Sequence, residues 1–159
     1  MRHYPANSPQ AAARILALAL LADGAIDPSE LHSLRQARLL ERLGMSERQF
    51  DEVIHALCED LLLYAGRSSS GQLEIGREAL RQVLGELTLP RLQRRVLQTV
   101  LDIVNADGCL AGGEAVLVSL AVECWDFGPH ETLRVTPQPG RRWPPQVARL
   151  ARAEARPGG

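Results

Sequence analysis

The sequence contains no lysine, so all 18 of its basic side chains are arginine. With 19 acidic side chains, the formal net charge is −1. A charge so close to zero lacks the overall basic surplus that marks many nucleic-acid-binding domains. Aromatic residues make up only 4% of the chain. Because aromatic and β-branched side chains favour strands, and both are scarce here, the composition argues against a β-rich fold.

Long hydrophobic runs and cysteine motifs are missing as well. The longest apolar run, residues 15–22, has eight residues, whereas a membrane-spanning helix needs about 20. We therefore expect no membrane span, and the first residues lack the apolar core of a signal peptide. The three cysteines form no CxxC or Cys/His pattern, which indicates reduced thiols in a cytoplasmic protein. Cys58 and Cys124 fall in apolar stripes and are expected in the core.

Leucine and alanine dominate what is present. With 26 and 20 copies among 159 residues, they favour an all-helical fold, and this length predicts one domain with a single core. Five of the ten prolines lie within residues 129–145. We therefore expect a helical domain over residues 1–127 and a Pro/Arg-rich tail over residues 128–159, in which residues 146–156 either form a short helix or stay loosely held.

The charge divides at nearly the same boundary. Residues 1–126 carry 12 arginines and 17 acidic side chains, whereas residues 127–159 carry six arginines and two acidic side chains. The overall balance is therefore an average of an acidic body and a basic tail.

Local start and stop signals predict the helices of the body. Capping side chains or prolines mark helix starts at residues 8–9, 27–30 and 46–49 and at Pro90. Apolar residues at helical spacing follow each start, and Gly44 is expected to end the second helix. A further helix over residues 113–125 is apolar nearly all round, which predicts a central, buried position. We expect a compact all-α bundle of six to seven helices, built from two related helix–turn–helix halves at about residues 8–65 and 72–127.

The strongest motif is an internal repeat with an offset of 84 residues. Residues 22–26 (ADGAI) align with residues 106–110 (ADGCL), and Glu30 aligns with Glu114. The shared pattern, A-D-G-x-[I/L]-x-x-x-E, lies both times between two predicted helices. Two matching copies indicate two related halves.

The acidic residues of the repeat have two interpretations. As helix caps, they place negative charge at the N-terminus of the following helix, where the dipole and the free N–H groups favour it. As ligands, they would offer hard oxygen atoms to a divalent cation such as Ca²⁺, Mg²⁺, Mn²⁺ or Zn²⁺. The candidate ligands are Asp23, Asp27, Glu30, Asp107 and Glu114. Their spacing is not that of an EF-hand.

These motifs resemble the TerB-like tellurite-resistance family. The resemblance is carried by residues 18–30 (LALLADGAIDPSE), by their echo at residues 106–114 (ADGCLAGGE) and by residues 43–46 (LGMS), and it covers about residues 10–126. The same fold is found in the N-terminal region of a membrane-anchored J-domain co-chaperone. The resemblance implies a compact all-helical domain of two similar halves from a bacterial stress-response system, with no established catalysis and with metal bound by the acidic residues of the repeats.

The chain departs from the family pattern in three places. Ala111 stands where the first copy has Asp27, two glycines open the last helix, and the tail is rich in proline and arginine. We expect a non-enzymatic domain that binds a divalent cation, a protein partner or both through the acidic turns. The alternative is a metal-dependent hydrolase using the same carboxylates, which would need an open coordination position and a substrate pocket.

Two arginine clusters complete the list of candidate sites. Arg91, Arg94 and Arg95 gather at the start of the fifth predicted helix, and residues 141–143 read RRW. Arginines beside an aromatic side chain can bind nucleic acid or anionic lipid. Because arginine replaces lysine throughout the chain, we interpret these clusters as a feature of its overall composition, which makes no firm case for a nucleic-acid partner.

Overall fold

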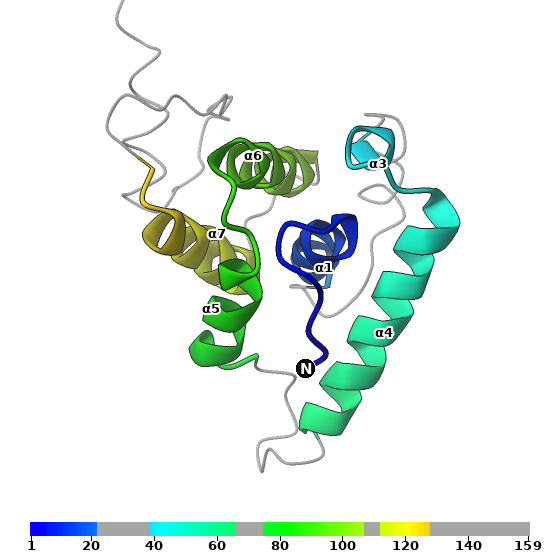
Figure 1. Ribbon diagram of the computed structural model, residues 1–159. Helices are drawn as coiled ribbons and strands as arrows, with labels where there is room; N and C mark the ends of the chain where they lie inside the picture. Colours follow the sequence, from blue (N-terminus) through cyan, green and yellow to red (C-terminus); the bar gives the residue numbers. More distant parts are fainter. Residues whose placement is uncertain (22–38, 66–74, 107–111, 128–159) are drawn as a thin grey trace, which may run out of the picture.

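The computed structural model describes residues 1–21, 39–65, 75–106 and 112–127, and these residues contain helices and no strands (Figure 1). The expected all-α class is confirmed for this part of the chain. The helices are α1 (Pro9–Leu20), α3 (Leu39–Arg42), α4 (Glu47–Ala65), α5 (Arg77–Gly85), α6 (Pro90–Ala106) and α7 (Gly112–Trp125). The predicted tail over residues 128–159, with its helix at 146–156, lies outside the described residues.

Helix α1 is the central element of the bundle. It packs mainly against α4 and α6 and also contacts α5 and α7, so neighbours cover it on several sides (Figure 1). Every residue from position 11 to position 20 is buried as a result. The alanines of α1 explain this placement, because their small side chains let helices approach from more than one direction.

The prediction of a central place for the helix over residues 113–125 was wrong. Helix α7 packs against α5 and α6, but Val116 is 37% exposed, and Glu123 and Cys124 lie at the surface. Cys124 is therefore no core thiol, and Cys58 is only partly buried. Apolar side chains around a helix do not by themselves decide how many other helices pack against it. In this protein α1, and not α7, occupies the central position.

The predicted helix ends that fall within the described residues agree with the structure, whereas the predicted start at residues 27–30 lies outside them. The Ser8 hydroxyl accepts a hydrogen bond from the Ala11 N–H at 3.1 Å, and Pro9 begins α1. Ser46 and Gln49 form the expected reciprocal pair: the Gln49 N–H donates to the Ser46 hydroxyl at 3.3 Å, and the Ser46 N–H donates to Gln49 Oε1 at 2.9 Å. Gly44 follows α3 with a φ of +70°, a left-handed conformation that glycine adopts without strain.

The core consists of the apolar faces that helical spacing predicted. The buried apolar side chains of α4, α5, α6 and the turn after α5 are Phe50, Val53, Ala56, Leu57, Leu61, Leu80, Val83, Leu84, Leu87, Val96, Leu97, Val100, Leu101, Ile103 and Val104. Helix α7 is joined to α5 by a polar contact as well, because the Trp125 indole N–H donates to the Leu84 carbonyl at 3.0 Å. None of the helices described is long and apolar enough to cross a membrane.

Candidate functional site

Of the five predicted metal ligands, the structure describes one. Asp23, Asp27, Glu30 and Asp107 lie outside the described residues. Glu114 lies in the first turn of α7, and its exposed fraction is 0%. The location of Glu114 at the start of a helix agrees with the sequence prediction; its complete burial is new.

Complete burial sets Glu114 apart from an ordinary capping glutamate. Glutamate is almost never fully buried unless it is paired, because removing a carboxylate from water is costly. At the N-terminus of α7 the helix dipole lowers that cost. Glu114 also stands at the third helical position, where the glutamate of a capping box stands, but Ala111 offers no hydroxyl or carboxylate to complete such a box. The site therefore places a carboxylate deep in the protein, at the end of the second repeat motif.

The two helices that precede the repeated turns lie against each other. Helix α1 leads to the first turn and α6 to the second, and α1 and α6 are in contact. The offset of 84 residues pairs buried positions of one helix with buried positions of the other, such as Leu16 with Val100 and Leu20 with Val104. The internal repeat therefore extends from the turns back into the core helices α1 and α6.

Within residues 1–21, 39–65, 75–106 and 112–127, no group of three or more His, Cys, Asp or Glu side chains is arranged to hold a metal ion. Four of the predicted ligands lie outside these ranges, so the predicted cluster itself stays a prediction. The one predicted ligand that the structure locates is a carboxylate, and carboxylate oxygen suits Ca²⁺, Mg²⁺ and Mn²⁺.

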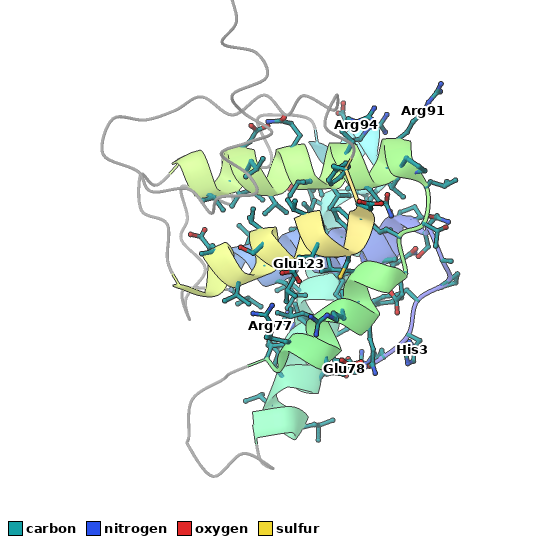
Figure 2. The ribbon with its side chains drawn as sticks, turned by 90° about the vertical axis from the view of Figure 1, so that its left-hand side faces the viewer. His3, Arg77, Glu78, Arg91, Arg94 and Glu123 are labelled. Atoms are coloured by element: carbon teal, nitrogen blue, oxygen red, sulfur yellow. The ribbon has the colours of Figure 1, made fainter. Side chains whose placement is uncertain are left out.

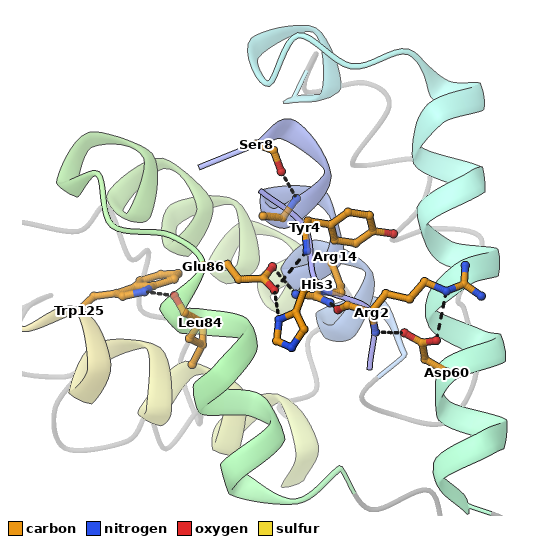
Figure 3. Close-up of polar contacts among 10 residues, drawn as sticks. Arg2, His3, Tyr4, Ser8, Arg14, Asp60, Leu84, Glu86 and Trp125 are labelled. Carbon is orange, nitrogen blue, oxygen red and sulfur yellow. Dashed lines mark hydrogen bonds and ion pairs between the residues drawn. The ribbon is translucent and has the colours of Figure 1, made fainter. Parts of the chain in front are cut away.

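The structure contains a buried ion pair between Arg14 and Glu86 that the sequence did not predict. The guanidinium of Arg14, only 2% exposed, donates to the Glu86 carboxylate and to the Arg2 carbonyl (Figure 3). The carbon at the centre of the guanidinium lies 5.0 Å from the centroid of the Tyr4 ring. Glu86 Oε1 in turn accepts from the Tyr4 N–H and lies near His3 Nδ1, both at 3.3 Å. The opposite charges of Arg14 and Glu86 compensate each other. Their hydrogen bonds to the backbone of Arg2 and Tyr4 join the N-terminal segment to α1 and to the end of α5.

One sequence signal could have located this ion pair. Arg14 interrupts a stretch, residues 11–22, whose other members are all apolar and which leaves the helix no polar face. An arginine in such a helix has no solvent side and needs a buried partner. The identity of that partner, Glu86, does not follow from the sequence, because it lies 72 residues away.

The start of α6 forms a second candidate site. An open, mostly apolar pocket of about 570 Å³ is lined by Leu89, Pro90, Arg91, Leu92 and Arg95. Figure 2 shows Arg91 and Arg94 extending outward from this end of α6. The predicted arginine cluster thus borders a hollow in the surface.

The chain matches no protein-family model, no curated protein and no solved structure. Function is therefore inferred from the chain's own residues.

Proposed function

We propose that this chain is a TerB-like domain of a cytoplasmic, tellurite-resistance-associated bacterial stress-response protein. In this proposal the chain has no catalytic activity and binds a divalent cation, a protein partner or both through its two acidic turns. The full fold would be a bundle of six to seven helices in two related halves. The all-helical structure of the described residues and the A-D-G-x-[I/L]-x-x-x-E repeat support it.

The observation that carries the proposal is the complete burial of Glu114. A glutamate that only caps a helix does not need complete burial, since capping and dipole interactions also form at the surface. Buried carboxylates are held by hydrogen bonds, by a positive side chain or by a metal ion. A role in cation binding gives a reason for a carboxylate at this depth and at this position of the repeat.

The chemistry of the candidate ligands favours hard cations. All five are carboxylates, which suit Ca²⁺, Mg²⁺ and Mn²⁺ better than Zn²⁺, whose protein sites usually include cysteine or histidine. Asp23, Asp27 and Glu30 alone would bind weakly. The contact between α1 and α6 supports a shared site, because each of these helices leads into one of the turns.

The alternative role for the same carboxylates is metal-dependent hydrolysis. The pocket at the start of α6 has no carboxylate among its lining residues. A metal-dependent hydrolase needs its substrate pocket beside the metal ligands. The pocket at the start of α6 is therefore no candidate for such a substrate pocket, and we propose the acidic turns as a binding site without catalysis.

Titration calorimetry with Ca²⁺, Mg²⁺ and Mn²⁺ tests the proposal. The wild-type chain should bind at least one of these ions, and the Asp23→Asn/Glu30→Gln variant should bind it at least tenfold more weakly. An Asp51→Asn/Glu52→Gln variant is the matched control, since it removes the same charge from the surface of α4. No heat from the wild type, or equal affinity in both variants, would leave helix capping as the role of the acidic residues.

A further inference from the structure

We propose that the surface contacted by residues 1–4 is a binding site for an extended segment of a partner protein that carries arginine and, two residues later, tyrosine. In this chain residues 1–4, here called the strap segment, occupy that site and act as its internal competitor. The site, here called the strap site, is formed by one side chain of α1, two of α4 and one at the end of α5: Arg14, Glu59, Asp60 and Glu86. None of these four residues is a candidate cation ligand, so peptide binding and cation binding are tested separately.

The strap site holds the main chain of the strap segment at every second residue (Figure 3). Asp60 Oδ2 accepts a hydrogen bond from the Arg2 N–H at 2.7 Å, and the Arg14 guanidinium donates to the Arg2 carbonyl. Two residues further on, Glu86 Oε1 accepts from the Tyr4 N–H at 3.3 Å. Contacts to alternate residues are typical of a bound extended peptide. Because they address the main chain, a segment of another protein can form them as well.

Two side chains of the strap segment add selectivity to these main-chain contacts. The Arg2 guanidinium donates to Glu59, and its Nε lies 3.3 Å from Asp60 Oδ1. Asp60 therefore binds the main chain with one oxygen atom and the arginine side chain with the other. The Tyr4 ring lies against the Arg14 guanidinium, with 5.0 Å between the guanidinium carbon and the ring centroid. An occupant of the strap site thus needs arginine and an aromatic side chain two residues apart.

The charge of the strap site favours a basic occupant. Its three carboxylates and one guanidinium give it a formal charge of −2. The side chain of Asp60 is only 9% exposed, and that of Glu86 only 10%. Carboxylates so far from water need a positive partner. Arg14 serves Glu86 and Arg2 serves Asp60, so an occupant without arginine would leave Asp60 without the partner it has here.

The strap segment is held less firmly than the turn that follows it. The side chains of Arg2, His3 and Glu59 are 46%, 77% and 65% exposed, and exposed ion pairs contribute little to stability. The turn, by contrast, is fixed by Asn7, whose N–H donates to the Glu86 carbonyl at 2.8 Å. The strap segment can therefore leave its site while the turn stays in place.

A tethered occupant makes a specific prediction about affinity. The strap segment is part of the chain, so its effective concentration at the strap site is high, and a free peptide must compete with it. The apparent affinity for that peptide is reduced to the fraction of molecules whose site is open. Substitutions that weaken the strap segment should therefore strengthen binding of the free peptide. A strap with a purely structural role would show no such gain.

Fluorescence anisotropy with the full chain tests the inference. The probe is a labelled peptide with the sequence of residues 1–8, MRHYPANS. The wild-type chain should bind it weakly, and the Arg2→Ala/Tyr4→Ala chain about tenfold more tightly. Adding Glu59→Gln/Asp60→Asn to that variant should weaken binding again by about tenfold, because the arginine of the peptide loses its carboxylates. Circular dichroism confirms that each variant is folded; Arg2→Ala alone, with a several-fold gain, serves if the double variant is not.

Two controls belong to the experiment. Arg48→Ala removes an exposed arginine of α4 outside the strap site, and its affinity should stay within about twofold of wild type. A peptide with alanine in place of its arginine and tyrosine should bind neither chain. No binding to any chain, no gain in Arg2→Ala/Tyr4→Ala, or equal binding of the alanine peptide would overturn the inference. A dimer of the wild-type chain that is lost in Arg2→Ala/Tyr4→Ala would assign the site to a second copy and overturn a partner protein as its occupant.

Discussion

Arg14 of α1 and Glu86 at the C-terminal end of α5 form an ion pair inside the protein, although 72 residues separate them in the sequence. The pair also holds the backbone of Arg2 and Tyr4. Removing one partner of such a pair leaves a buried charge without compensation, which is more costly than removing both.

We expect Glu86→Gln and Arg14→Met each to lower the free energy of unfolding by about 3–5 kcal/mol, measured by urea denaturation. The double variant should lose less than the sum of the two, because no charge is then left buried alone. The exposed pair Arg48 and Glu52 is the control, and its removal should change stability by less than about 0.5 kcal/mol. Additive losses, or losses as small as those of the control, would contradict the buried pair.

Asn7 should prove important through its side chain and its backbone together. Asn7→Gly keeps the positive φ but loses the hydrogen bonds to Thr88 and Leu89, so it should cost about 1–2 kcal/mol. Asn7→Ala adds the strain of a left-handed alanine, about 1 kcal/mol more. Asn7→Asp retains the acceptor and should stay near wild type. Equal stability of the alanine and glycine variants would show that the φ of Asn7 carries no strain.

Asp102 gives the stability a small pH dependence. Desolvation raises the pKa of this carboxyl group, and the Gln98 side chain, which donates to Asp102 Oδ1 at 3.0 Å, partly opposes the rise. A raised pKa in the folded state means that the charged form is disfavoured there. Asp102 therefore destabilises the fold above its folded pKa, and this effect disappears as the pH falls below 3.8, the ordinary value.

Asp102→Asn should accordingly raise the free energy of unfolding at pH 7, by about 0.5 kcal/mol or less because the residue is exposed. The gain should shrink at acidic pH. Urea denaturation of both proteins at several pH values measures the difference. A variant less stable than wild type at pH 7, or a gain independent of pH, would contradict the assignment.

Cys124 should react slowly with thiol reagents although it is exposed. Desolvation raises the pKa of its thiol, Arg81 acts against the rise and Glu123 adds to it. In a Cys58→Ser/Cys109→Ser background, Arg81→Gln should slow the reaction with a disulfide reagent at pH 8, because less thiolate is present. Arg77→Gln is the control, since Arg77 lies equally close to Glu123, at 3.8 Å. Equal rates in the two variants would contradict the role of Arg81.

Local sequence signals predicted the helix ends because a cap needs only neighbouring residues. Ser8, the pair of Ser46 and Gln49, Gly44 and Pro90 all stand where the sequence placed them. The same holds for the buried face of each amphipathic helix, since its spacing alone defines the face.

Features that depend on distant parts of the chain could not be predicted in this way. The central place of α1 depends on which helices surround it, and the partner of Arg14 depends on how α5 packs. The candidate cation site also depends on how distant parts of the chain pack. The repeat motif identified Glu114 as a residue of interest, but its burial depends on the packing of α7 and cannot be derived from its neighbours in sequence.

The most direct test of the proposed cation site is the anomalous diffraction of Mn²⁺ in crystals of the full chain. The account predicts one strong Mn²⁺ peak within coordination distance of Glu114 and of carboxylates from both acidic turns, including Asp23, Glu30 or Asp107. The same peak should be lost in crystals of Asp23→Asn/Glu30→Gln. Turns that lie far apart, with no Mn²⁺ peak at Glu114, would contradict it.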